Sequence, residues 1–224
     1  AEELPGPDCD PKRLRVLGED LIAFKDSEGR PGVVDAYCPH RGAPMFYGRN
    51  EESGLRCVYH GWKFDVTGAC TDLPNAPEGE TFKNKVTINA YPAAEKGGAI
   101  WVYMGPKEKQ PPLPGYRFMD LPATHRYTWK IHIECNYFQS LEGDIDTSHA
   151  NFLHSTLGDQ ANNPRINVRR ADQAAIQDKM PRYAMLEDKD YGLLQVTTRS
   201  GPSGQTRVGI THYIMPSTTT AGSD

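Results

Sequence analysis

Two short segments that contain cysteine and histidine constrain this chain more than any other feature. The first is a C-x-H segment with Cys38 and His40, and after sixteen intervening residues a C-x-x-H segment follows with Cys57 and His60. A zinc finger usually takes its cysteines from one element and its histidines from another, whereas here each segment carries one of each. The pattern therefore favours a [2Fe-2S] cluster in which two thiolates hold one iron and two imidazoles hold the other, with zinc as the alternative.

The residues around these ligands resemble a known family. The segments CPHRG and CVYHGWKFD, which begin at Cys38 and Cys57, are similar to the Rieske loops of bacterial aromatic-ring-hydroxylating oxygenases. Respiratory-chain Rieske proteins carry extra cysteines that form a disulfide across the loops, but residues 41–56 contain no cysteine. The resemblance therefore favours the oxygenase branch.

Composition argues against several other classes of protein. The chain has no apolar run long enough to span a membrane, and its first residues, AEELP, lack the basic head and apolar core of a secretory signal. The formal net charge of -4 gives no reason to expect nucleic acid or an anionic membrane as a partner. Cys9, Cys70 and Cys135 follow no pairing pattern, and free thiols indicate a reducing compartment, so we expect a cytoplasmic protein.

Proline and turn signals divide the chain into two parts. Short β-prone runs separated by turn signals fill the first hundred residues, and both ligand segments are expected at hairpin tips. A stiff, proline-rich stretch over residues 106–114 follows. We therefore predict an all-β Rieske domain over residues 1–110 and a second domain over residues 111–224.

The second part mixes strand and helix patterns. Residues 126–134 alternate apolar and polar side chains, which predicts a half-buried strand. A helix is expected over residues 137–154, and further strands over residues 193–198 and 208–214. The predicted fold class is α+β, and the resemblance implies that the second part is the start of a truncated, helix-grip-type catalytic domain with an antiparallel sheet and helices.

The predicted helix carries a second candidate metal site. Asp146, His149 and His154 offer two imidazoles and a carboxylate, the ligand types that hold non-haem Fe(II) with positions open for O₂. On a regular helix Asp146 and His149 face the same side, but His149 and His154 are about 140° apart. We therefore predict a distortion of the helix near Asn151 to Leu153. Helices with acids and histidines are common, so this motif alone is a weak signal.

The order of the two motifs strengthens the second site. It resembles the large subunit of Rieske non-haem iron oxygenases, and residues 139–154 are most similar to the phthalate dioxygenase group. The resemblance implies that His149 and His154 bind a mononuclear Fe(II) and that Asp146 hydrogen-bonds one of them. It also implies that Asp146 contacts His60 of a neighbouring subunit, which requires a ring of subunits, most simply a homotrimer.

The resemblance leaves one ligand unassigned. The third iron ligand of the family is an Asp or Glu on a later helix, and we expect it beyond Asp224, so the chain is interpreted as a fragment. Glu142 is expected to line the iron pocket.

The implied activity is that of a terminal oxygenase component. Such a protein takes electrons from an NAD(P)H-dependent reductase with flavin, ferredoxin or both, and uses O₂ to hydroxylate an aromatic acid such as a phthalate-like compound, with cis-dihydroxylation as the leading outcome. An O- or N-demethylase of the same family is one alternative. A Rieske ferredoxin-like electron carrier without oxygenase activity is another, and a zinc-stabilised binding module is a third.

Overall fold

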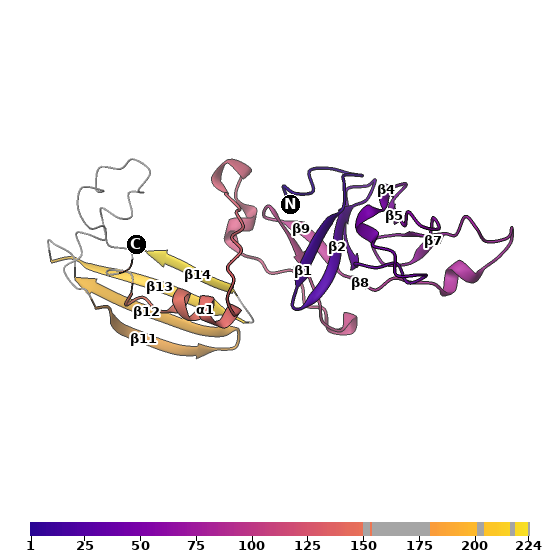
Figure 1. The fold of residues 1–224 in the computed structure, drawn as a ribbon. Coiled ribbons are helices and arrows are strands. Elements are labelled where there is room, and N and C mark those ends of the chain that lie inside the picture. Colours follow the sequence, from indigo (N-terminus) through magenta and orange to yellow (C-terminus); the bar gives the residue numbers. More distant parts are fainter. Residues whose placement is uncertain (150–152, 154–179, 201–203, 216–217, 224) are drawn as a thin grey trace. The chain divides into compact units, whose positions relative to one another are not determined.

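The computed structural model describes residues 1–149, 153, 180–200, 204–215 and 218–223. Contacts between residues divide the chain into two compact units, Ala1–Lys130 and Ile131–Asp224 (Figure 1). The domain boundary predicted after residue 110 stays a prediction. Among the described helices none is both long and apolar enough to cross a membrane.

The first unit is built from short antiparallel sheets. One has the order β1-β2-β3-β8, with β1 (Lys12–Val16), β2 (Glu19–Lys25), β3 (Pro31–Asp35) and β8 (Ala90–Tyr91). The second has the order β4-β5-β6-β7, with β4 (Arg49–Glu51), β5 (Gly54–Arg56), β6 (Lys63–Phe64) and β7 (Cys70–Asp72). A hairpin of β9 (Ala93–Lys96) and β10 (Ala99–Val102) completes the strands of this unit.

Tight turns and short helices connect these strands. The β9–β10 hairpin turns through Gly97 and Gly98, whose φ angles of 68° and 83° suit residues without a side chain. Single 3₁₀ turns lie in the longer connections: η1 (Met45–Tyr47), η2 (Phe82–Lys85), η3 (Lys107–Lys109), η4 (Arg117–Asp120) and η5 (Ala123–His125). The all-β character predicted for the N-terminal part is confirmed.

A single apolar cluster joins the two larger sheets and includes both predicted cysteine ligands. Phe24, Phe64 and Met45 are fully buried in it, and Cys38 and Cys57 pack in the same cluster. The two predicted cysteine ligands are therefore anchored in a closely packed core, which leaves their side chains little freedom to move.

Replacing Phe24 by alanine is expected to lower the free energy of unfolding by about 3–5 kcal/mol, since it opens a cavity in this core. The ring lies directly against Gly32, where an added Cβ would come within 2.6 Å of the ring carbon Cζ. Urea unfolding of the wild type and the variant measures the loss. Phe118→Ala is the control, because Phe118 is 45% exposed and its truncation should change the unfolding midpoint little.

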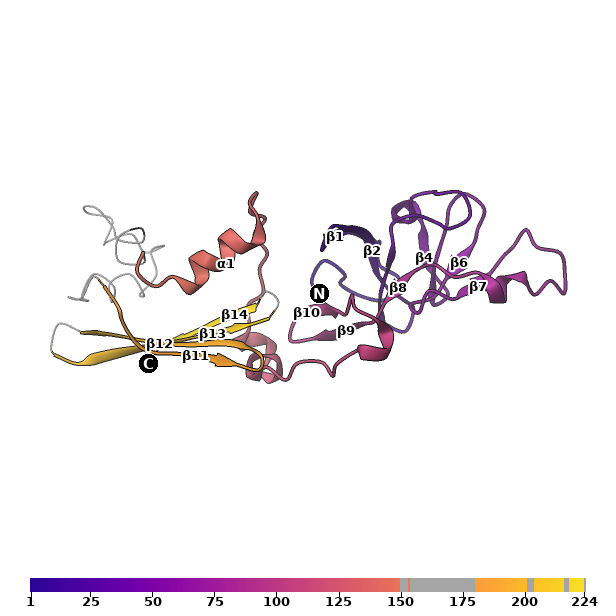
Figure 2. The same cartoon turned by 90° about the horizontal axis from the view of Figure 1, so that it is seen from below.

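The second unit is a helix on an antiparallel sheet. The sheet runs in the order β11-β12-β13-β14, with β11 (Arg182–Lys189), β12 (Gly192–Ser200), β13 (Thr206–Ile214) and β14 (Thr218–Ser223). The helix α1 (Tyr137–Ile145) lies along one face of it (Figure 2). Asn136 caps its N-terminus by accepting a hydrogen bond from the Phe138 amide. The predicted α+β class is confirmed.

Two predicted elements differ from the structure. Residues 126–134 form no strand, and Tyr127 and Trp129 are 86% and 66% exposed. A strand needs a hydrogen-bonded neighbour, and no described strand pairs with this segment. The helix predicted to reach His154 ends at Ile145, because Asp146 takes an extended conformation with φ −69° and ψ 114°. The described chain is therefore bent before His149.

Candidate metal centres

The first ligand loop follows β3 and is closed by its own backbone. The Cys38 amide donates to the Ala43 carbonyl at 2.8 Å, and the Gly42 amide donates to the Cys38 carbonyl at 2.9 Å. Gly42 has φ +67°, a conformation that glycine adopts without strain. Tyr37 and Pro44 form an isolated bridge at the base of the loop. The loop joins β3 to β4, which belong to different sheets, so it is closed by this one bridge and is not the tip of a two-stranded hairpin as predicted.

The second loop joins β5 to β6 and repeats this backbone design. The Cys57 amide donates to the Trp62 carbonyl at 2.8 Å, and the Gly61 amide donates to the Cys57 carbonyl at 3.0 Å. Gly61 has φ +75°, and an added Cβ would lie only 2.6 Å from Cγ of Pro74. Two loops of different sequence spacing are therefore closed by the same pair of hydrogen bonds.

The thiols of Cys38 and Cys57 face the interior, where they are only 4% and 2% exposed. Burial raises the pKa of Cys38 to about 11, although the His40 backbone amide, which donates to its sulfur, acts in the opposite direction. A thiolate, not a thiol, is the metal ligand. Iron binding at this position must therefore displace a proton, and the positive charge of the metal would supply the compensation that the apolar surroundings do not.

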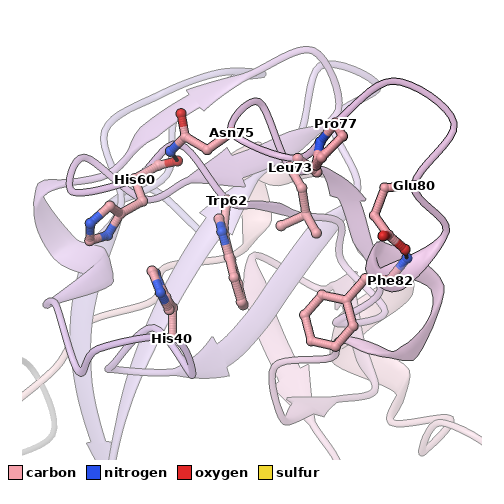
Figure 3. Close-up of a pocket in the computed structure, with 9 residues that line it drawn as sticks. His40, His60, Trp62, Leu73, Asn75, Pro77, Glu80 and Phe82 are labelled. Carbon is pink, nitrogen blue, oxygen red and sulfur yellow. Dashed lines mark hydrogen bonds between the residues drawn. The ribbon is translucent and has the colours of Figure 1, made fainter.

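The imidazoles of His40 and His60 lie together at the rim of the same site, with ring centroids 4.5 Å apart (Figure 3). Nδ1 of His40 is buried and has no hydrogen-bond partner among the described residues. Burial also lowers the pKa of His40, which favours the neutral ring that binds metals. A buried nitrogen without a partner is costly, so this atom fits a metal ligand better than a structural histidine.

The four donors form a thiol pair and an imidazole pair. Cys38 lies close enough to Cys57 for their thiols to interact, and the ring centroids of His40 and His60 are 4.5 Å apart. A thiol pair beside an imidazole pair suits a cluster in which each iron takes one pair. This arrangement supports the [2Fe-2S] prediction over the zinc alternative.

Trp62 supports the imidazole pair and was not predicted as a site residue. Its indole stacks on the His40 ring with centroids 4.4 Å apart and an interplanar angle of 8° (Figure 3). A cavity of about 430 Å³ opens beside these rings and is lined by His40, His60, Trp62, Leu73, Asn75, Ala76, Pro77, Glu80 and Phe82. The histidine pair therefore borders a surface cavity, while the thiols are enclosed by protein.

Asp146 and His149 lie together just after α1. Oδ2 of Asp146 is 3.3 Å from Nδ1 of His149, and Oδ1 accepts hydrogen bonds from the Ser148 hydroxyl at 2.6 Å and its amide at 2.7 Å. These hydrogen bonds, from Ser148 first and His149 next, hold the pKa of Asp146 below its ordinary value. An ionised carboxylate thus lies within hydrogen-bond distance of Nδ1 of His149. A carboxylate in this position orients histidine ligands in metal sites.

The strand β12 holds the segment that carries Asp146. Gln195 is only 3% exposed, and its side-chain amide donates to the Ile145 carbonyl at 3.0 Å. Arg199 donates to the Thr147 carbonyl from the same face of the strand. Sequence reasoning missed both residues, and the available signal was a pair of long polar side chains four positions apart, which places them on the same face of the strand.

Three of the predicted features of the iron site remain predictions. His154 lies outside the described residues, as do Asn151 and residue 152 of the predicted distortion. Leu153 is described, and its amide donates to the His149 carbonyl at 2.8 Å, which is a helical hydrogen bond. Glu142 lies on α1, where its carboxylate accepts a hydrogen bond from Gln139 at 2.9 Å.

These two loops on a small β domain define a Rieske-type iron–sulfur protein, and comparisons with known proteins agree. Residues 1–92 match the Rieske [2Fe-2S] domain family, and residues 102–223, more than half of the chain, match the LigXa C-terminal domain-like family. The chain belongs to the Rieske non-haem iron oxygenases, in the group of phthalate dioxygenase-like large subunits. The family resemblance of the loops is thereby confirmed, and oxygenases of this family also use a mononuclear iron.

Two individual relatives are similar to about two thirds of this chain. The chain is 49% identical over 144 residues to the 3-chlorobenzoate-3,4-dioxygenase oxygenase subunit of Comamonas testosteroni, covering 64% of this chain and 33% of that protein. It is 44% identical over 155 residues to the phthalate 4,5-dioxygenase oxygenase subunit of Pseudomonas putida, covering 69% and 35%. The chain therefore spans about a third of the length of these relatives.

A solved structure shares the fold. Dicamba monooxygenase bound to dicamba matches with a TM-score of 0.72 and 18% identity, over 98% of this chain and 63% of that one. This likeness concerns the fold alone.

Proposed function

We propose that this chain belongs to the terminal oxygenase component of a multicomponent system that uses O₂ to hydroxylate an aromatic acid, with cis-dihydroxylation as the leading reaction. The observation that carries the proposal is the presence, in one chain, of a buried thiol pair with an adjacent imidazole pair and of a separate carboxylate–histidine pair. Two relatives named for 3-chlorobenzoate and phthalate support an aromatic carboxylate as the substrate class.

The proposed functional residues belong to two separate sites. Cys38, Cys57, His40 and His60 would hold the cluster, and His149 would bind the mononuclear iron together with His154. When bound, these groups supply single electrons and the activation of O₂. Asp146 orients His149 through Nδ1, while Gln195 and Arg199 fix the segment around it.

The proposed partners follow from this division. A reductase that oxidises NAD(P)H through flavin, ferredoxin or both would deliver the electrons. We also propose a homotrimer, in which Asp146 of one subunit approaches His60 of the next, and a cytoplasmic location. The rim position of the histidines, beside a cavity at the surface, suits electron transfer to another protein chain because short donor–acceptor distances need exposed ligands.

The test uses the full-length protein with a reductase, NADH and a panel of benzoates and phthalates under ¹⁸O₂. A cis-dihydrodiol that carries two labelled oxygens is expected. Release of formaldehyde from a methoxylated acid would instead identify the demethylase alternative. Iron content separates the electron carrier: two irons per subunit and no oxygenated product from any panel member would contradict the proposal, whereas three irons with product support it.

A further inference from the structure

Arg56 occupies the position immediately before the ligand Cys57, and its side chain runs behind the second ligand loop. The side chain is only 11% exposed. Its Nη1 donates to the Gly61 carbonyl at 2.8 Å and to Asp72 Oδ2 at 2.6 Å, while Nε donates to Glu51 Oε1 at 2.6 Å. One guanidinium thus connects the end of the ligand loop to the carboxylates of Glu51 on β4 and Asp72 on β7.

The surrounding charges form a network that excludes most of the solvent from this arginine. Glu52 Oε2 lies 3.4 Å from Nη2 of Arg56 and 2.8 Å from Nζ of Lys63, whose side chain is 9% exposed. Arg49 and Arg56 hold the pKa of the Glu51 carboxyl below its ordinary value. The network is therefore ionised at neutral pH, and Arg56 is its least exposed member after Lys63.

The loop atom that Arg56 contacts is already restrained by other contacts. Gly61 follows the ligand His60 directly, its amide donates to the Cys57 carbonyl at 3.0 Å, and Pro74 leaves no room for a side chain. Arg56 binds the remaining polar backbone group of this residue, the carbonyl oxygen. Both backbone polar groups of Gly61, its amide and its carbonyl, are thus hydrogen-bonded.

We propose that Arg56 is a positioning residue for the [2Fe-2S] cluster, which fixes the end of the second ligand loop and places a permanent positive charge behind Cys57. An arginine stays protonated at every accessible pH. Reduction adds one negative charge to the cluster, and a nearby cation favours that state by Coulomb attraction. The residue would therefore raise both the retention of the cluster and its reduction potential.

The experiment compares Arg56→Gln, Arg56→Lys and Arg49→Gln in the full-length holoprotein. Arg49 is a matched control because it lies directly opposite Arg56 in the β4–β5 pair and also binds Glu51, at 3.1 Å, yet its side chain is 64% exposed and contacts no ligand loop in the described structure. The readouts are the rate of iron loss to a chelator, the EPR spectrum of the reduced cluster, and its midpoint potential.

Arg56→Gln is expected to lower the midpoint potential and to accelerate cluster loss about 10- to 100-fold, the usual cost of losing a residue that orients metal ligands. Arg56→Lys keeps the charge, so its potential should stay near that of the wild type. Lysine lacks the planar fork that donates from Nε and Nη1 at separate positions, so it should hold Glu51, Asp72 and Gly61 less well and cluster loss should still accelerate. Arg49→Gln should change neither quantity.

Two results would overturn the proposal. If Arg56→Gln and Arg49→Gln behave alike in both potential and cluster loss, Arg56 acts only as a surface charge. If Arg56→Gln is isolated without its cluster, Arg56→Lys decides: cluster loss at the wild-type rate in that variant would show that the contact with Gly61 does not position the loop. Neither readout requires oxygenase activity, so the outcome is independent of the proposed reaction.

Discussion

Replacing Cys57 by serine is expected to remove the [2Fe-2S] cluster, with loss of its visible absorbance and of its EPR signal on reduction. The physical reason is that the cluster is held by thiolates, and the hydroxyl of serine does not ionise at neutral pH. Cys57 is only 2% exposed, so bulk water has little access to its position. Oxygenase activity that depends on electrons from the cluster should disappear with it.

Cys70→Ser is the matched control. Cys70 is also buried, at 7% exposure, and belongs to the same apolar cluster, but its sulfur faces the Asp72 carbonyl at 3.5 Å rather than the ligand loops. This variant should keep a full complement of cluster iron. A Cys57→Ser protein with the wild-type EPR signal would refute the ligand assignment.

Replacing Asp146 by asparagine is expected to reduce turnover by about 10- to 100-fold while the Rieske cluster keeps its spectrum. An asparagine oxygen can still accept the hydrogen bonds from Ser148, so the turn after α1 should persist. The negative charge beside Nδ1 of His149 is lost, and with it the charge that orients this imidazole and makes it a stronger ligand. Single-turnover product formation in the full-length enzyme measures the effect.

Asp144→Asn controls for a change of charge near the same end of α1. Asp144 is exposed, and its carboxylate accepts a hydrogen bond from Thr219 at 3.0 Å, away from His149. Its replacement should leave turnover within about twofold of the wild type, as is usual for surface substitutions. Equal losses in the two variants would show that Asp146 has no special part in the reaction.

The predicted ligand loops were recognisable from sequence because the hydrogen bonds that close each loop are local. Each ligand loop spans six residues, from Cys38 to Ala43 and from Cys57 to Trp62, and a glycine with positive φ lies within each. Residue type and spacing are therefore enough to indicate the backbone path of each loop. The contribution of Arg56 was not visible, because its partners Asp72 and Glu51 approach it only through the pairing of four strands, β4 to β7.

The second site was less predictable because distant residues shape it. The spacing of Asp146 and His149 correctly indicates that their side chains meet, but a continuous helix was wrong, since Ser148 draws the Asp146 carboxylate into a local turn. The supporting Gln195 is fifty residues away in sequence. The alternation over residues 126–134 shows the converse: a strand-like pattern forms no strand without a neighbour to pair with.

The matched closure of the two ligand loops has a consequence for the cost of holding the cluster. Main-chain hydrogen bonds restrain the path of each loop, so much of the conformational entropy of the loop residues is lost in forming these bonds. Less of that entropy loss then has to be offset by the bonds between the predicted ligands and the metal.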